Sequence, residues 1–349
     1  MNLFLPKWLS LSFLILLLSG TIVGLYWFNT KLVLISNMNP IIADNWHLLR
    51  EKIETLTEDP EPIIMYFVGD IMLDRGVRQS VIDNYNGDYH LFLENLNYLK
   101  TGDIVFGNLE GPVSDQGWNL GNLYSFRMEP IVLQVLADLG FNVLSVANNH
   151  MGDWGREAFG DTLNRLNQSN ILAVGGGLVS EATQIKIFEI NGVKIGFLAL
   201  TDIGPTWLKA TTEERGMLWA NNPTRSEIIA EGAKEVDILI TSFHFGEEYQ
   251  ERSNWRQRFL AREAIEAGAD LVIGHHPHVI QEAEWYQDGF IIYSLGNFVF
   301  DQYFSTETMT GLVLKVTVDP TTKKIEGISG HLSTQAQDYQ PPFLDLADL

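Results

Sequence analysis

Beyond residue 62, the chain alternates between short, continuous apolar runs and longer helical stretches. Apolar runs of this length that end in small polar residues are typical of buried strands. Strands are predicted at 63–68, 104–109, 142–147, 171–174, 237–243, 270–273, 290–295 and 312–318. Helices are predicted at 91–99, 130–139 and 156–168. This order predicts an α/β fold of layered sheets and helices in a domain at 63–335, followed by a tail at 336–349.

Proline, asparagine and glycine mark several boundaries of these elements. Pro130 suits the first turn of its helix, and Gly140 suits the position just beyond the end of that helix. Asn191-Gly192 lies between two runs of alternating polarity. This dipeptide predicts a tight hairpin closed by a type I′ turn.

The N-terminal segment carries a different apolar pattern. No charged residue occurs from Trp8 to Thr30, and about 20 apolar residues suffice to cross a bilayer as a helix. Residues 1–30 are interpreted as a transmembrane helix, with a cleaved signal peptide as the alternative. Residues 31–62 are interpreted as a stalk that ends in two prolines. The anchor predicts a single-pass protein of the cell membrane, and either alternative predicts an extracytoplasmic globular domain.

Composition and charge exclude several classes of protein. With 46% apolar and 19% charged residues, the chain is not mainly disordered. A formal net charge of −21 argues against nucleic-acid binding, which needs clustered Lys and Arg. The absence of cysteine excludes disulfides, thiolate nucleophiles and cysteine-based metal sites. Any metal must therefore be held by His, Asp, Asn or Glu.

Polar side chains collect where five predicted strands end, and five of the eight histidines are among them. In open α/β sheets, ligands bind beyond the carboxyl ends of the strands. Each residue alone has a structural alternative, for example a helix cap for Asp70 or a buried core histidine for His244. Coincidence at all five strand ends is a poor explanation. The groups are Asp70, Asn108-Leu109-Glu110, Asn148-Asn149-His150, His244 and His275-His276-Pro277-His278.

These residue types suit one or two divalent ions of Zn, Mn or Fe. Two such ions about 4 Å apart can clamp a phosphoryl group. A nearby histidine that does not bind metal can protonate the leaving oxygen. Bound cations also reverse the local field, so an acidic protein can take an anionic substrate.

Six stretches of the chain carry a resemblance to a known family. In order they are 67–73, 108–112, 147–155, 243–249, 273–279 and 293–298. They resemble the CapA family of capsule and poly-γ-glutamate synthesis proteins, a branch of the calcineurin-like metallophosphoesterases. The resemblance covers residues 63 to about 330 and implies a layered sandwich of two β-sheets flanked by helices. The N-terminal membrane anchor is also similar to that of family members.

The resemblance implies a role for each group at the strand ends. His150 takes the place of the general acid, and Glu110 takes that of the carboxylate that bridges two metals. His275 has no assigned role and is interpreted as support for a ligand. Arg75 is interpreted either as a ligand for an anionic group of the substrate or as a surface residue. The implied metal ligands are Asp70, Glu110, Asn149, His244, His276 and His278.

The chain departs from the superfamily pattern at two positions. Met72 stands where the first motif usually has a histidine, and Glu110 stands where an aspartate is usual. These departures leave open whether the centre holds one metal ion or two. Four further acidic residues are interpreted as structural: Asp153, Glu247, Glu248 and Asp301.

Two hypotheses about function follow from the resemblance. The first is a membrane-anchored, metal-dependent hydrolase that acts on a phosphoester or a surface polymer. The second is a non-catalytic factor in a complex that makes or exports an anionic polymer such as poly-γ-glutamate. Its partners would be membrane-bound components of the polymer synthetase. The retained His150 favours the first hypothesis, and the methionine at position 72 favours the second.

Overall fold

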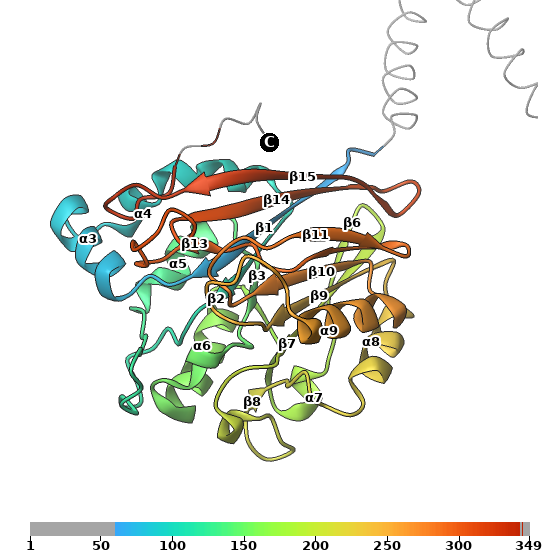
Figure 1. The fold of residues 1–349 in the computed structure, drawn as a ribbon, viewed down its shortest axis with the longest axis horizontal. Coiled ribbons are helices and arrows are strands. Elements are labelled where there is room, and N and C mark those ends of the chain that lie inside the picture. Colours follow the sequence, from blue (N-terminus) through green and yellow to red (C-terminus); the bar gives the residue numbers. More distant parts are fainter. Residues whose placement is uncertain (1–59, 343, 345–349) are drawn as a thin grey trace, which may run out of the picture. The chain divides into compact units, whose positions relative to one another are not determined.

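The computed structural model describes residues 60–342 and 344. They form two β-sheets that pack face to face, with helices on the outer side of each sheet (Figure 1). The predicted α/β fold of packed sheets flanked by helices is confirmed. The predicted membrane anchor and nearly all of the predicted stalk lie outside the described residues. Within the described part of the chain, no helix combines the length and apolarity needed to cross a membrane.

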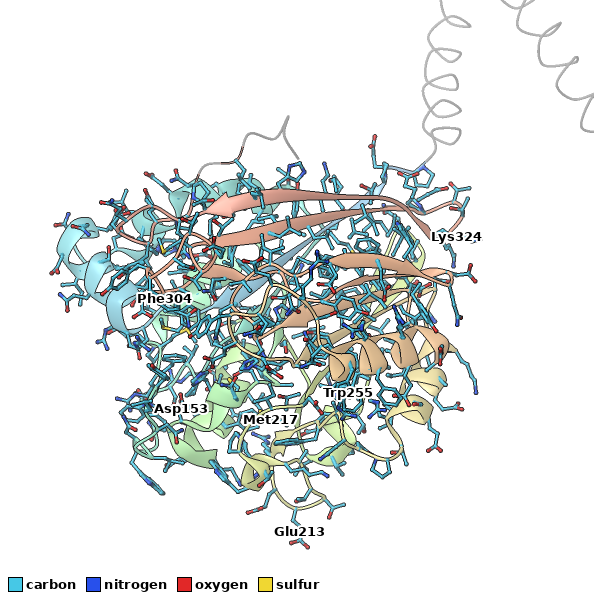
Figure 2. All side chains as sticks on the ribbon, in the orientation of Figure 1. Asp153, Glu213, Met217, Trp255, Phe304 and Lys324 are labelled. Carbon is cyan, nitrogen blue, oxygen red and sulfur yellow. The ribbon has the colours of Figure 1, made fainter. Side chains whose placement is uncertain are left out.

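Seven strands form the first sheet. They are β1 (Ile63–Ile71), β2 (Ile104–Leu109), β3 (Val143–Ser145), β4 (Leu172–Val174), β13 (Asn297–Val299), β14 (Thr310–Asp319) and β15 (Lys324–Thr334). Strands β1 to β4 are parallel neighbours, and β13 pairs with the end of β1. The β14–β15 hairpin extends the sheet on the other side of β1. Phe304 and Lys324 mark opposite ends of this sheet in Figure 2.

Six strands form the second sheet. They are β6 (Lys186–Ile190), β7 (Val193–Thr201), β9 (Ile238–His244), β10 (Leu271–His275), β11 (Ala283–Tyr286) and β12 (Gly289–Ile292). The four central strands β7, β9, β10 and β12 are parallel, and β6 and β11 are antiparallel edges. A separate pair joins β5 (Gly176–Gly177) to β8 (Gly216–Met217).

Helices cover the outer faces of both sheets. The α-helices are α3 (Arg75–Tyr85), α4 (Tyr89–Phe92), α5 (Ile131–Asp138), α6 (Gly155–Gln168), α7 (Val179–Ala182), α8 (Arg225–Ala233) and α9 (Trp255–Glu266). Short 3₁₀ helices are η1 (Glu94–Thr101), η2 (Asn149–Gly152) and η3 (Thr206–Leu208). Helices α3, α5 and α6 bury apolar side chains against the first sheet, and α8 and α9 bury theirs against the second.

A layer of apolar side chains fills the space between the sheets. Phe67 and Phe106 from the first sheet meet Phe197 from the second, and the rings of Phe106 and Phe197 stack at 6.0 Å. Five strands are buried on both faces, and their apolar residues pack both between the sheets and against the helices, as in other parallel α/β sheets. These strands are β1, β2, β7, β9 and β10. This double burial explains why these strands read as continuous apolar runs.

The structure confirms most predicted elements and corrects two. All eight predicted strands exist, although the third is shorter than predicted and the seventh ends earlier. The hairpin turn has positive φ at Asn191 (51°) and Gly192 (77°), as type I′ requires. The stretch predicted at 91–99 is helical but divided: the Asp88 carboxylate caps the short α4, and a 3₁₀ helix follows it. Helices α3, α8 and α9 were not predicted.

A close backbone contact joins β1 to the segment before β13. A Cβ atom on Gly69 would lie 1.9 Å from the carbonyl oxygen of Gly296, so only glycine fits there. The next residue, Asp70, donates its backbone N–H to the same carbonyl oxygen at 3.0 Å. This contact fixes the end of β1, where the first predicted metal ligand lies.

Candidate metal centre

The predicted site residues come together where the carboxyl ends of strands from both sheets meet. In the first sheet, Asp70 on β1 lies opposite Asn108 on β2. In the second sheet, His244 on β9 lies opposite His275 on β10. The ends of these four parallel strands thus deliver polar side chains to the same edge, as expected for an open α/β arrangement.

Three of the predicted ligands form one group that could hold a metal ion. Asp70, Glu110 and His244 each offer a ligand atom, and these atoms lie within 4.8 Å of one another. All three side chains are buried. Glu110 Oε1 lies 3.7 Å from His244 Nε2 and has no hydrogen-bond partner among the described residues. A buried carboxylate oxygen without a partner is costly, and a bound cation would satisfy it.

Asn108 holds the two carboxylates of this group. Its Nδ2 donates to Asp70 Oδ1 at 2.8 Å and also donates to Glu110 Oε2. Its Oδ1 accepts a hydrogen bond from Asn148 Nδ2 at 3.1 Å, which sets the orientation of the amide. The amide therefore positions both acidic ligands without using a charge.

The two carboxylates differ in their electrostatic environment. Burial favours the neutral form of Asp70, but the His275 and His278 rings beside it hold its pKa well below the usual range. Burial, together with the nearby charge of Asp70, raises the pKa of Glu110 well above its usual range.

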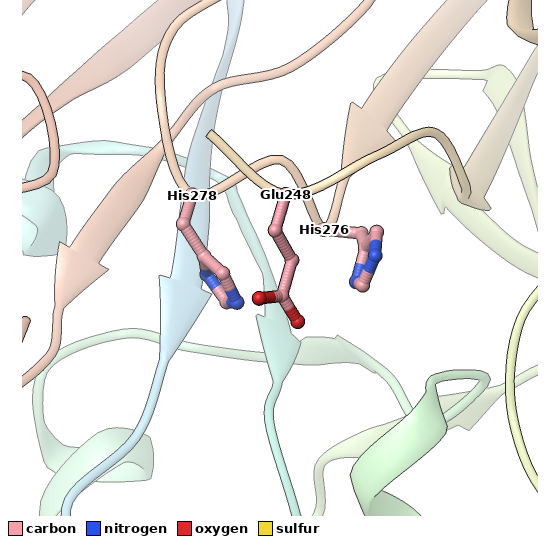
Figure 3. Close-up of side chains that lie close together, drawn as sticks. All are labelled: Glu248, His276 and His278. Carbon is pink, nitrogen blue, oxygen red and sulfur yellow. The ribbon is translucent and has the colours of Figure 1, made fainter. Parts of the chain in front are cut away.

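A second group of ligands lies next to the first. Glu248, His276 and His278 offer ligand atoms within 4.8 Å of one another, and the Glu248 carboxylate lies between the two imidazole rings (Figure 3). His278 Nδ1 lies 2.9 Å from Asn297 Oδ1 and 3.2 Å from Asp70 Oδ2. Asp70 therefore contacts both groups and links them.

The backbone around the second group is strained. His276 and His278 have φ values of 99° and 58°, in a region that favours glycine. Such strain persists only where the surrounding structure imposes it, and it concentrates at functional sites. Here it turns two imidazoles from one short loop toward the same point.

Burial keeps two histidines neutral and ready to bind metal. It lowers the pKa of His276 to about 3, with a contribution from His278. It also lowers the pKa of His244 well below the usual range, with a contribution from His276. Neutral imidazole is the form that binds a metal ion. His276 Nδ1 is buried and has no hydrogen-bond partner among the described residues.

The 3₁₀ turn η2 presents two further predicted residues. Asn148 caps this turn, since its Oδ1 accepts the backbone N–H of His150 at 3.1 Å. Asn149 Oδ1 lies 2.6 Å from His244 Nε2, the atom with which His244 faces Glu110. These two atoms therefore converge on the first ligand group, as expected for Asn149 as a ligand.

His150 lies beside the ligands and is held by an acidic residue. Its Nδ1 is 2.8 Å from Asp153 Oδ2, and its ring packs on Phe126 with the centroids 4.1 Å apart. Asp153 Oδ2 also accepts the backbone N–H of Phe126 at 2.9 Å. This arrangement uses Nδ1 and leaves Nε2 for a substrate oxygen.

The remaining predicted residues lie at the edge of the centre. His275 is buried with Nδ1 3.4 Å from Asp70 Oδ1, and neither of its ring nitrogens has a hydrogen-bond partner among the described residues. Arg75 is partly exposed and pairs with Asp301. Met72 is fully buried in the apolar cluster beneath helices α3, α5 and α6. Its sulfur accepts the backbone N–H of Asp74 at 3.2 Å.

The donor set fits a divalent metal ion. Imidazole, carboxylate and amide oxygen together suit Zn, Mn or Fe, and atoms in both groups lack another partner in the described structure. From the sequence, Glu248 and Asp153 are further candidates that favour a structural interpretation. Asn108 and Asn148 belong to the strand-end groups without an assigned role, and Asn297 has no assigned role. Strand-end position was an available signal for Asn108. The signal for Asn297 was its place in the 293–298 stretch.

Comparison with known proteins identifies the family. The model of the bacterial capsule synthesis protein PGA_cap matches residues 64–302. The capsule biosynthesis protein CapA of Bacillus anthracis is 34% identical over 285 residues, covering 78% of this chain and 68% of that protein. The PGA biosynthesis protein CapA of Bacillus subtilis is 36% identical over 271 residues, covering 75% and 69%.

A solved structure of a novel phosphatase from Mycoplasma pneumoniae is also similar to this chain. It is 16% identical and covers 78% of this chain and 93% of its own, with a TM-score of 0.47. That score is too low to support an argument. The family model and the two CapA relatives show that this chain belongs to the bacterial capsule synthesis protein family PGA_cap.

Proposed function

We propose that this chain is a membrane-anchored metalloprotein that hydrolyses a phosphoester, or a bond in a surface polymer, during capsule or poly-γ-glutamate biosynthesis. The observation that carries the proposal is the pair of buried ligand groups linked by Asp70, with His150 beside them. A protein that only bound metal for stability would have no need of an oriented, non-ligand imidazole at this place.

The chain offers ligands for two divalent ions, of Mn, Zn or Fe. Asp70, Glu110, Asn149 and His244 would hold one, and Glu248, His276 and His278 would hold the other. When bound, such ions neutralise charge on the substrate and activate water. Asn108 and Asn297 keep the ligands in place through the hydrogen bonds described above.

His150 supplies the proton in this proposal. The Asp153 carboxylate orients the ring through Nδ1 and stabilises its protonated form. The ring then donates its Nε2 proton to the leaving oxygen of the substrate. Phe126 packs on one face of the ring and limits its contact with water.

A non-catalytic assembly or export factor remains the second candidate, favoured by Met72 in place of a metal-binding histidine. In either case, we propose that residues 1–30 anchor the chain in the cytoplasmic membrane with the globular domain outside the cytoplasm. The partners would be membrane-bound polymer synthetase components, and the substrate would be an anionic polymer or a phosphoester.

Metal content and hydrolysis of bis(p-nitrophenyl) phosphate by the full chain in detergent test the proposal. We expect His276→Gln to lose metal, and His150→Gln to keep metal but lose about 10²- to 10⁴-fold in turnover. His90 is an exposed histidine whose Nε2 lies 3.0 Å from Asp138, so His90→Gln is the matched control. Metal binding without turnover of any phosphoester or polymer substrate would favour the assembly factor.

A further inference from the structure

We propose that Arg75 binds a second anionic group of the substrate, a carboxylate or a phosphate, next to the metal centre. This inference rests on the proposed function in one respect, because it takes the metal centre as the place where the substrate reacts. It assigns a specificity-determining residue that lies outside both ligand groups.

Arg75 is held in a fixed position by its backbone conformation and by an ion pair that one edge of its guanidinium makes with Asp301. Arg75 has a φ of 51°, which is unfavourable for a residue with a long side chain. Its Nε lies 3.2 Å from Asp301 Oδ2, and the same oxygen accepts the backbone N–H of Gly76 at 2.9 Å. Asp301 therefore fixes both the start of α3 and the direction of the arginine side chain.

Aromatic rings place the guanidinium close to the ligands. Its central carbon lies 5.2 Å from the centre of the Phe126 ring and 5.7 Å from that of Tyr124. Phe126 packs against His150 at 4.1 Å and against Phe300 at 5.6 Å, and Phe300 packs against His278 at 4.9 Å. A single ring thus separates Arg75 from the proposed general acid.

The outer edge of the guanidinium has no partner. Among the described residues, no acceptor contacts either Nη atom of Arg75, whose side chain is 37% exposed. Other arginines of this acidic protein use an Nη atom to bind a carboxylate. The pairs are Arg78–Glu129, Arg165–Asp115, Arg225–Glu263, Arg256–Asp202 and Arg262–Glu284.

The geometry of this free edge determines the class of ligand. Two Nη groups in one plane match the two oxygens of a carboxylate or phosphate, and such paired, charge-assisted bonds are strong. Because Asp301 and the rings already fix the side chain, little freedom is lost when the anion binds. A lysine would keep the charge but not the paired geometry.

Binding measurements on the metal-loaded full chain test the inference. The probes are inorganic phosphate and a short oligomer of γ-linked glutamate, each titrated by calorimetry. We expect Arg75→Gln to weaken binding of one probe about tenfold or more, and Arg75→Lys to weaken it less. The probe that is affected shows whether the group is a phosphate or a carboxylate. Metal content should stay at the wild-type value.

Arg262→Gln is the matched control, because it removes the same charge from α9 on the outside of the second sheet. It should bind both probes as the wild type does. Equal affinities of Arg75→Gln and wild type would overturn the inference, as would a wild type that binds neither probe or an equal loss in the control. If Arg75→Gln does not fold, weaker binding by Arg75→Lys supports the inference and unchanged binding overturns it.

Hydrolysis measured in parallel separates this inference from the proposed function. If the wild type hydrolyses no substrate but Arg75→Gln binds a probe more weakly, the hydrolase fails and the anion site stands. If the wild type is active and Arg75→Gln keeps its affinity for both probes, the anion site fails and the hydrolase stands.

Discussion

Asp153 Oδ2 lies 2.8 Å from Nδ1 of His150, although sequence reasoning treated this aspartate as structural. The same carboxylate accepts hydrogen bonds from the Phe126 backbone and, through Oδ1, from the Asn122 side chain at 2.8 Å. One buried carboxylate therefore fixes both the proposed general acid and the loop that covers it. The contacts with Phe126 and Asn122 hold loop 113–128. The exposed apolar residues of this loop include Trp118 and Leu123.

Asp153→Asn should lower turnover by about ten- to a hundredfold while metal content stays unchanged. An amide at this place cannot stabilise the protonated imidazole of His150, although it retains a similar shape. Steady-state kinetics measure the effect, which we expect in kcat rather than in KM, because the carboxylate orients the ring without contacting the substrate. Asp161→Asn, on the outer side of α6 and paired with Arg165, is the control. A loss of metal in Asp153→Asn would contradict this role.

Glu248→Gln and Glu110→Gln should each remove about one equivalent of metal, because each glutamate belongs to a different ligand group. Metal analysis after dialysis measures the number of equivalents. The exposed neighbour Glu247 provides the control Glu247→Gln, which should keep the full amount. A single equivalent in the wild type, lost in both variants, would mean that the two groups share one ion.

Acid should destabilise the metal-free protein partly through His276. Its pKa falls from 6.5 in the unfolded chain to about 3 in the folded one, so between these values only the unfolded state binds the proton. The free energy of unfolding thus falls with falling pH, by up to about 1.4 kcal/mol per pH unit for this group. Urea titrations with chelator at pH 6 and pH 4 should show a smaller difference for His276→Gln. Equal differences would contradict the assignment.

Two glycine substitutions should have opposite effects on stability. Gly69→Ala would press its Cβ against the carbonyl of Gly296 and should destabilise the fold by about 1–3 kcal/mol or more. Gly160 lies within α6, and a Cβ atom added there would meet no atom within 4 Å. Gly160→Ala should therefore stabilise the fold by about 0.5–1 kcal/mol. Thermal unfolding measures both. A harmless Gly69→Ala would show that β1 can move away from that carbonyl.

The elements that sequence reasoning missed are those whose pattern is least distinctive. In helix α8 the apolar and polar residues are only weakly separated onto two faces, and helix α9 carries many charged residues. A start signal for α9 was present, since Asn254 and Gln257 form a capping box. The strands were easier to predict because parallel strands buried on both faces are apolar at nearly every position.

The sequence by itself determined the succession of strands along the chain, the polar residues at the ends of five of them, and the resemblance to the family. These features depend on local pattern, on residue type and on motifs within short stretches. Only the tertiary structure decided which ligands share a group, because Asp70 and His244 lie on two different strands and Glu110 directly follows a third. It also decided that Glu248 joins His276 and His278, and that Asp153 holds His150. The two ligand groups depend on distances between segments that packing alone brings together. The contact between Asp153 and His150 joins residues three apart, and it depends on the local turn that the structure forms there.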